Sequence, residues 1–279
     1  MMMKTVKFSN GTTVPALGQG TWGMGEGHNS IDAEADCLKK GLDLGLTLID
    51  TAEMYANGGA EKVVGVALQK NRDRAFVVSK VLPSHASANG TIEACERSLK
   101  NLKTDVIDLY LLHWPSSYPL EDTVMAFEQL MKQGKIKAWG VSNFDVADMT
   151  ELENLASQGH ITVNQILYNL SRRGTEFDLL PWCQKRNIAL MAYSPIEQGR
   201  ILKNAKLQDL AKSVGLSVVV LALAWVIRQP QMIAIPKASS IEHIKENYKA
   251  LDLKLDPDIL KKLDAIFTPP THKMPLEVI

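Results

Sequence analysis

Short apolar runs alternate with longer amphipathic stretches along almost the whole chain. Eight of these runs have the length and composition of buried strands, and they cover residues 16–20, 47–49, 76–79, 107–112, 138–141, 162–166, 189–192 and 232–235. Helical periodicity lies between and after them, at residues 31–44, 60–69, 91–102, 120–133, 145–158, 175–186, 217–229 and 241–250. Most consecutive strands are about thirty residues apart, the size of one βαβ unit. The pattern therefore predicts an α/β fold of repeated strand–helix units.

Eight such units in 279 residues are typical of a (β/α)8 TIM barrel, which usually takes about 250 residues. We therefore expect residues 1–279 to form a single barrel domain with a short C-terminal tail. Residues 4–8 and 12–14 flank the turn sequence Ser-Asn-Gly, which indicates an N-terminal β-hairpin. A doubly wound open sheet is the alternative fold.

One motif favours the open sheet at first sight. Residues 18–23, Gly-Gln-Gly-Thr-Trp-Gly, match the G-x-G-x-x-G dinucleotide fingerprint letter for letter. A true fingerprint opens a helix whose N-terminus holds the pyrophosphate, and an acidic residue ends a strand about twenty residues later. Here residues 24–30 continue as a loop, and no such acid follows. We interpret the match as coincidental and the glycines as a tight first loop.

A polar or aromatic side chain stands at or directly after nearly every predicted strand. In a TIM barrel the carboxyl ends of the strands meet at one mouth, where functional groups gather. From the second strand onward these residues are Asp50, Lys80, His113 with Trp114, Ser142 with Asn143, Gln165, Tyr193 with Ser194, and Lys237. A single acid or tyrosine at a strand end usually serves a turn or an interface. Seven successive strands with such ends indicate a functional site.

Asp50, Tyr55, Lys80 and His113 have the chemistry of a proton-transfer group. A phenol with a pKa near 10 holds its proton too tightly to be an efficient acid at neutral pH. We expect the Lys80 ammonium to lower the pKa of Tyr55, and the Asp50 carboxylate to keep Lys80 charged. His113 would donate an N–H to the oxygen of a substrate carbonyl.

The chain closely resembles the aldo-keto reductases over essentially its whole length. The motifs that carry the resemblance are GQGTW at 18–22, LIDTAEMYANGGAEKVVGVAL at 48–68, VVSK at 77–80, DLYLLHWP at 108–115, WGVSNF at 139–144, NQILYN at 164–169, MAYSP at 191–195 and IPKASSIEHIKEN at 235–247. The chain is most similar to bacterial single-domain members that reduce small reactive aldehydes such as methylglyoxal.

The resemblance implies a barrel that binds NADPH without a Rossmann domain and reduces small aldehydes or ketones, methylglyoxal-like and aromatic aldehydes among them, to alcohols. It assigns the catalytic tetrad to Asp50, Tyr55, Lys80 and His113, with Tyr55 as the general acid. The residues implied to line the substrate site are Trp22, Tyr55, His113 and Trp114.

The resemblance also implies a set of cofactor contacts. Ser142, Asn143 and Gln165 match positions that bind the nicotinamide carboxamide, and Tyr193 matches the aromatic residue that stacks on the ring. Asn247 matches an adenine contact. The other implied cofactor residues are Gly20, Thr21, Trp22, Asp50, Ser194, Pro195, Ile196, Lys237, Ala238, Ser239, His243 and Glu246.

The choice between NADPH and NADH depends on the segment that begins at Lys237. Lys237 and Ser239 match positions near the adenosine 2′-phosphate, before a helix with a predicted capping box of Ser239 and Glu242. A helix N-terminus favours an anion, so we expect NADPH. His243 stands where the family often has an arginine, and histidine is a weaker cation.

Two further departures from the family pattern concern loops at the mouth. Glu197 lies near the expected path of the pyrophosphate and would repel it unless Arg200 or solvent offsets its charge. The tail after Phe267 is short, where members with narrow specificity have long C-terminal loops. We therefore expect a more open site and a broad substrate range.

Composition limits the partners and the location. The chain carries 31 basic and 31 acidic residues, so no excess charge favours nucleic acid or an anionic membrane. Three separated cysteines without a CxxC motif indicate reduced thiols, and the longest apolar run, residues 218–227, is about half of a membrane span. The histidines lack metal-ligand spacing. We expect a cytoplasmic monomer without a metal, whose partner is a small carbonyl substrate.

Two other function classes stay open. A lysine at a strand end can form a Schiff base, as in an aldolase-type lyase, but Asp50 would keep Lys80 protonated and a protonated amine is not a nucleophile. The aldo-keto reductase fold also serves as an accessory subunit of channels, and function depends on the site rather than on the fold. The complete tetrad favours an enzyme.

Overall fold

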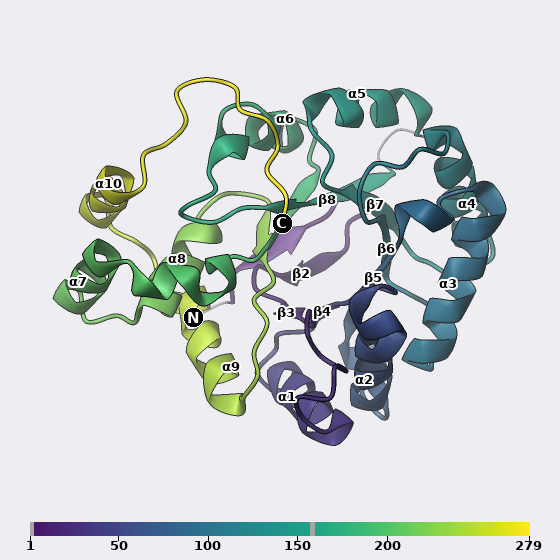
Figure 1. Ribbon diagram of the computed structural model, residues 1–279, viewed down its shortest axis with the longest axis horizontal. Helices are drawn as coiled ribbons and strands as arrows, with labels where there is room; N and C mark the ends of the chain where they lie inside the picture. The colour runs from purple at the N-terminus through teal and green to yellow at the C-terminus, as the bar shows by residue number, and fades with distance from the viewer. Residues whose placement is uncertain (1–2, 157–159) are drawn as a thin grey trace.

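The computed structural model describes residues 3–156 and 160–279, and a barrel of parallel strands lies at its centre (Figure 1). The eight strands pair in chain order: β3 Gln19–Gly20, β4 Leu48–Asp50, β5 Phe76–Val81, β6 Leu109–Leu112, β7 Trp139–Ser142, β8 Ile161–Leu167, β9 Ala189–Tyr193 and β10 Met232–Ala234. Parallel bridges from Leu17 to Ala234 and from Gly20 to Lys237 join the first strand to the last. The predicted TIM barrel and its eight strands are therefore confirmed.

Helices surround the strands and alternate with them (Figure 1). They are α1 Ile31–Asp43, α2 Gly59–Leu68, α3 Ala88–Leu102, α4 Leu120–Lys132, α5 Val146–Leu155, α6 Leu179–Lys185, α7 Ala205–Ser213, α8 Val218–Val226, α9 Ile241–Tyr248 and α10 Pro257–Ile266. Short 3₁₀ turns occupy Tyr55–Gly58, Arg72–Arg74, Pro83–His85, Gly174–Glu176, Glu197–Lys203 and Lys249–Asp252.

The eight predicted helices are confirmed, with different ends. The predicted end of the fifth helix at Gln158 lies outside the described residues. The sixth helix is shorter than predicted because Asp178, with φ −135°, separates a 3₁₀ turn from α6. Helices α7 and α10 were not predicted, because both fall outside the simple strand–helix repeat.

Polar side chains fix the starts of several helices. Ser30, Ser87, Asn204 and Ser217 each accept a hydrogen bond from the backbone N–H three residues later. At α5, Asp145 forms a full capping box with the third helical residue. These contacts satisfy N–H groups that have no partner inside the helix. Local sequence therefore determines where these helices begin.

The G-x-G-x-x-G match does not open a helix. Residues 21–30 form turns, and α1 begins only at Ile31. Glu34 of α1 is buried and accepts a hydrogen bond of 2.8 Å from the Gly25 N–H, which fixes the loop. The structure thus agrees with the interpretation of this motif as coincidental.

An antiparallel hairpin, β1 Thr5–Lys7 and β2 Thr13–Pro15, precedes the barrel as predicted. Phe8 is buried, and its ring lies 5.7 Å from that of Phe76 at the start of β5. Gln231, just before β10, donates a hydrogen bond of 3.1 Å to the Lys7 carbonyl. Since Phe76 and Gln231 stand at the amino ends of their strands, the hairpin covers the end of the barrel opposite the mouth.

The apolar helix α8 is part of the core. Residues 220–226 of this helix are all buried. Within the part of the chain that the structure describes, no single helix is long and apolar enough to cross a membrane. The pair α7 and α8 meets the length and composition criteria only jointly, and the two helices are bent by 93°.

Gly140 marks a close approach between two barrel strands. It lies in β7 at a register irregularity with β8, and a Cβ at this position would lie 2.3 Å from the Val163 carbonyl oxygen. We predict that Gly140→Ala lowers the free energy of unfolding by about 2 kcal/mol, because the strands must separate. Urea denaturation would measure the loss. Gly174→Ala is the control, since its Cβ would meet Met274 at an ordinary 3.5 Å; equal stability of the two variants would contradict the prediction.

Candidate active site

The carboxyl ends of the strands bring the predicted side chains to one mouth. Asp50 is the last residue of β4, Lys80 lies near the end of β5, and Ser142 is the last residue of β7. Strand pairing aligns Gly20 with Asp50 and Ser142 with Gln165. Residues separated widely in sequence therefore become neighbours through the barrel register.

Lys80 is the centre of a buried hydrogen-bond network. Its Nζ donates to Asp50 Oδ2 at 2.8 Å, to the Thr51 carbonyl oxygen at 2.8 Å and to the Tyr55 hydroxyl at 3.1 Å. Lys80 is 0% exposed and Asp50 is 2% exposed. The three contacts use all three N–H donors of an ammonium group. A neutral amine has only two N–H donors, so this geometry fits a charged lysine.

The electrostatics of the pair agree with this assignment. Burial lowers the pKa of Lys80, but the charge of Asp50 and the contacts with Tyr55 raise it, and the net pKa lies above its ordinary value. Burial raises the pKa of Asp50 above its ordinary value, although Lys80 and the hydrogen bond from Gln165 oppose this rise. A buried charge needs a partner and hydrogen bonds, and each of these two residues supplies both to the other.

The pKa of Tyr55 changes in the direction opposite to the prediction. Burial raises it above the ordinary value of 10.0; Lys80 opposes this rise, and Asp50 adds to it. The expectation that Lys80 lowers the pKa of Tyr55 below its ordinary value is therefore wrong, because desolvation of the phenolate is the larger effect. The phenol stays protonated at neutral pH, which is the form that a proton donor requires.

His113 is held neutral beside Tyr55. It follows β6, is 8% exposed, and has its ring centroid 5.8 Å from that of Tyr55. Burial, together with the charge of Lys80, lowers the pKa of His113 to about 2. A neutral imidazole carries one N–H donor and one acceptor. His113 can therefore donate a hydrogen bond without adding a charge to the site.

Two exposed indoles stand on the open side of this group. The Trp22 ring lies 5.0 Å from Tyr55, and the Trp114 ring lies 4.9 Å from His113. Trp22 is 55% exposed and Trp114 is 38% exposed. Large apolar side chains around a few polar groups are typical of small-molecule sites. The four predicted substrate-site residues are thus together.

Amide and aromatic side chains lie on another side of Asp50. Gln165 Nε2 donates to Asp50 Oδ1 at 2.7 Å. Asn143 Nδ2 donates to Ser142 Oγ and to the His113 carbonyl at 3.1 Å each, and Tyr193 donates to Asn143 Oδ1 at 2.9 Å. Asn143 has φ 60°, a left-handed conformation that asparagine tolerates. This set combines amide groups with an aromatic ring, as a nicotinamide site requires.

The start of α9 differs by one residue from the prediction. The N-cap is Ser240, whose side chain accepts a hydrogen bond of 3.2 Å from the His243 N–H. The predicted capping box of Ser239 and Glu242 is therefore wrong. Ser239 instead accepts a hydrogen bond of 2.9 Å from Lys237 Nζ. The start of α9 thus has a lysine, Lys237, and a hydroxyl, Ser239, directly before it. This combination is suited to binding an anion.

The remaining predicted cofactor residues lie mostly along the same rim. Thr21 Oγ1 donates to the Asp50 carbonyl at 2.9 Å. The residues that border a cavity of about 10 Å³ include Gly20, Ala238 and Asn247. The loop after β9 contains Ser194, Pro195 and Ile196. Glu246 borders a different, open groove beside residues 249–253.

Glu197 is a buried acid with several partners. Asn169 Nδ2 donates to its Oε2 at 2.6 Å, and Arg200 Nη2 donates to its Oε1 at 2.8 Å. Arg172 donates to the same Oε1 through Nε at 3.3 Å and Nη2 at 3.2 Å. Burial raises the pKa of Glu197, but these hydrogen bonds lower it below its ordinary value. The predicted compensation by Arg200 is present, and Arg172 adds a second cation.

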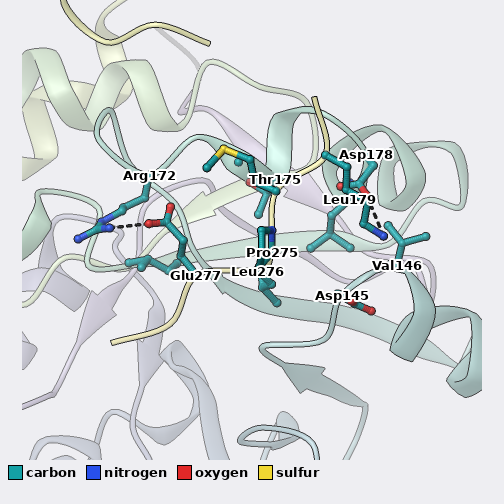
Figure 2. A pocket seen from close by; sticks show the side chains of 13 residues that line it. Asp145, Val146, Arg172, Thr175, Asp178, Leu179, Pro275, Leu276 and Glu277 are labelled. Carbon is teal, nitrogen blue, oxygen red and sulfur yellow. Dashed lines mark hydrogen bonds and ion pairs between the residues drawn. The ribbon is translucent and has the colours of Figure 1, made fainter. Parts of the chain in front are cut away.

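The tail crosses the barrel mouth although it is short. Figure 1 shows it running from α10 to the centre of the barrel, and Figure 2 shows Glu277 paired with Arg172. This ion pair measures 2.5 Å, and a second one joins Lys273 to Asp178 at 3.7 Å. A cavity of about 40 Å³ lies beneath the tail. The short tail therefore lies over part of the mouth, and the expectation of a more open site than in members with long C-terminal loops stays a prediction.

The end of the tail also reaches the predicted nicotinamide side. Burial raises the pKa of Tyr193 to about 12, and a hydrogen bond from the Ile279 backbone opposes this rise. Asn169, Arg172 and Glu277 are residues of the mouth that were not predicted. Asn169 lies in a recognised motif, but no local pattern connects Arg172 with Glu277.

Metal ligands are not clustered in the described residues, where no group of three or more His, Cys, Asp or Glu side chains could hold an ion. Cys37, Cys95 and Cys183 are free and buried. Burial raises the pKa of Cys95 and of Cys183 to about 12, so these thiols are unreactive at neutral pH.

Comparison with known proteins identifies the family. A model of the aldo/keto reductase family matches residues 16–267, and the chain belongs to this family. It is 48% identical to methylglyoxal reductase YeaE of Escherichia coli over 100% of both chains. It is 35% identical to glyoxal reductase of Bacillus subtilis, covering 94% of this chain and 92% of that protein.

A solved structure shows the same fold. The aldo-keto reductase from Klebsiella pneumoniae in complex with NADPH superposes with a TM-score of 0.96 at 48% identity, over 100% of both chains. The recognised resemblance and the barrel are thus confirmed independently.

The buried neutral His113 predicts a pH-dependent loss of stability. Its pKa is about 2 in the folded protein and about 6.5 when unfolded. Below 6.5 the unfolded state binds the extra proton, so stability falls as pH decreases. From pH 7 to pH 5 the free energy of unfolding should fall by about 2 kcal/mol because of His113. Urea denaturation of wild type and His113→Gln at both pH values would measure it; equal losses in the two proteins would show that His113 titrates normally.

Proposed function

We propose that this protein reduces small aldehydes and ketones, with methylglyoxal-like and aromatic aldehydes as substrates, to alcohols by hydride transfer from NADPH. The observation that carries the proposal is the buried contact of 3.1 Å between the Tyr55 hydroxyl and Lys80 Nζ, beside a neutral His113. The family supports the reaction class, that of an NADP-dependent oxidoreductase. The activities named for the relatives from Escherichia coli and Bacillus subtilis support small reactive aldehydes.

Side chains of the protein would donate the proton and stabilise the charge that develops on the carbonyl oxygen. When bound, NADPH supplies the hydride that adds to the carbonyl carbon. The neutral imidazole of His113 donates a hydrogen bond to the carbonyl oxygen and orients it. The Tyr55 hydroxyl then gives its proton to that oxygen, and the Lys80 ammonium stabilises the resulting phenolate. Asp50 keeps Lys80 charged throughout.

The cofactor would lie between two groups of side chains. Ser142, Asn143 and Gln165 would contact the carboxamide, and Tyr193 would stack on the nicotinamide ring. Fixed contacts of this kind turn one face of the ring toward the reacting carbon. Lys237 and Ser239, 2.9 Å apart, would hold the 2′-phosphate. The Klebsiella structure with NADPH supports this assignment of the cofactor.

We further propose a cytoplasmic monomer in which residues 1–279 form one domain. The contacts of the hairpin with β5 and of the tail with Arg172 support one domain, because both ends of the chain pack on the barrel. The Schiff-base alternative is disfavoured because the contacts of Lys80 use all three donors of its ammonium.

Tyr55→Phe tests the proton donor. We predict that kcat for methylglyoxal falls by about 10² to 10⁴-fold, because the variant lacks the acidic hydrogen. The dissociation constant of NADPH, measured by protein fluorescence, should stay within about twofold. Tyr118→Phe, which removes an exposed hydroxyl, is the control and should keep full activity. Retention of more than a few per cent of kcat by Tyr55→Phe would exclude Tyr55 as the acid.

Lys237→Ala tests the choice of cofactor. A hydrogen bond to a charged group contributes roughly 1.5 to 3 kcal/mol, so we predict about ten- to a hundredfold weaker binding of NADPH and little change for NADH. Fluorescence titrations with both cofactors would measure this. Lys245→Ala, on the helix that follows Lys237, is the control. Equal losses for NADH and NADPH would mean that Lys237 supports the fold or the pyrophosphate instead of the 2′-phosphate.

A further inference from the structure

The loop after β9 has an unusual backbone. Ser194, Glu197 and Gln198 have φ of 46°, 52° and 53°, and Gly199 has φ of 84°. Left-handed conformations are unfavourable for residues with a Cβ and persist only where surrounding contacts hold them. Contacts from other segments must therefore hold this loop in its conformation. The loop follows directly after Tyr193.

The restraint comes from the segment after β8. Asn169 Nδ2 donates to the Ser194 carbonyl at 3.0 Å and to Glu197 Oε2 at 2.6 Å. Arg172 contacts the other oxygen of Glu197 through two of its nitrogens. The Glu197 side chain is only 6% exposed, so its contacts are shielded from water. Glu197 is thus the point where the strained loop is attached.

Arg172 also holds the tail. Its Nη1 donates to Glu277 Oε1 at 2.5 Å (Figure 2). Its Nε and Nη2 donate to Glu197 Oε1. The planar guanidinium can serve two carboxylates at once, which a lysine cannot do with the same geometry. Without Arg172 the Glu277 carboxylate would lose this partner, and Glu197 would keep only Arg200 and Asn169.

The loop and the tail meet at a second place. The Ile279 backbone contacts the Tyr193 hydroxyl, one residue before the strained stretch begins. Leu276 of the tail packs against the hydrophobic core, and a cavity of about 40 Å³ remains beside it, in whose lining the Oγ1 of Thr175 is buried without a partner among the described residues. The pair with Arg172 therefore adds a polar attachment to the apolar one.

We propose that Arg172 is a positioning residue that couples the cofactor-side loop, residues 194–199, to the tail that crosses the barrel mouth. The proposal rests on the proposed function for its assignment of the cofactor and substrate sites. A change in the tail alters the restraint on Glu197, and so cofactor binding and substrate binding change together. Arg172 acts through Glu197 and Glu277 and does not contact the reacting atoms.

Glu277→Gln tests the coupling with little risk to the fold, because its side chain is 35% exposed. The pair is partly exposed, so we expect the NADPH dissociation constant and the KM for methylglyoxal each to rise about two- to fivefold. The kcat should stay within about twofold, because the tetrad is untouched. A higher KM with an unchanged NADPH dissociation constant would overturn the proposal, since the tail would then act alone.

Variants of Arg172 separate coupling from general stability. Arg172→Met should weaken NADPH and raise KM by about three- to tenfold, because both acids lose their shared partner. Arg172→Lys should recover only part of this loss, since one ammonium cannot reproduce the forked contact. Arg186→Met is the control, because it breaks a pair of similar exposure with Glu153. Full recovery by lysine, or equal effects in the control, would contradict the proposal.

A readout without cofactor or substrate separates this proposal from the proposed function. Backbone hydrogen bonds of 2.9 Å hold the Glu197 and Gly199 N–H groups inside the loop. Amide hydrogen exchange at these residues should be about two- to fivefold faster in Glu277→Gln than in the wild type. Unchanged exchange would overturn the coupling even if the enzyme reduces aldehydes. Faster exchange in a protein that reduces none would support the coupling and reject the proposed function.

Discussion

The rest of the site depends on one ion pair, Lys80 with Asp50, which the barrel buries almost completely. Removing two charges from water costs several kcal/mol per ion, and only full pairing offsets this. Here every donor of Lys80 is used, and each oxygen of Asp50 accepts a hydrogen bond, Oδ2 from Lys80 and Oδ1 from Gln165. The pair therefore requires β4, β5 and β8 to be in the observed register. It also gives Tyr55 a fixed cationic neighbour.

The position of the tetrad could be predicted from the sequence because it depends on local patterns. Apolar runs that end abruptly in Asp50, Lys80 or His113 specify strand ends, and the barrel then brings strand ends together. Gln165 was predicted at the mouth for the same reason. Its hydrogen bond to Asp50 could not be predicted, because it joins residues 115 positions apart.

The errors arose where a balance of effects or a contact distant in sequence decides the outcome. Whether the pKa of Tyr55 rises or falls depends on burial against the charge of Lys80, and a sequence does not give the burial. Ser239 and Ser240 are both good N-caps, and only the backbone shows that Ser240 is used. The length of the tail likewise does not predict where it lies, because its contact with the barrel joins Glu277 to Arg172, 105 residues away.

The two parts of the mouth have different kinds of support. The tetrad stands mainly on strands and short buried contacts, so its geometry changes little unless the barrel itself unfolds. The loop after β9 and the tail depend on ion pairs through Arg172, in which Glu197 of the loop is buried and Glu277 of the tail is partly exposed. A partly exposed pair such as that of Glu277 contributes little to stability. The contacts of Lys80 and Asp50 are with each other and with Thr51, Tyr55 and Gln165, so the buried charges do not depend on how the loop and the tail are held.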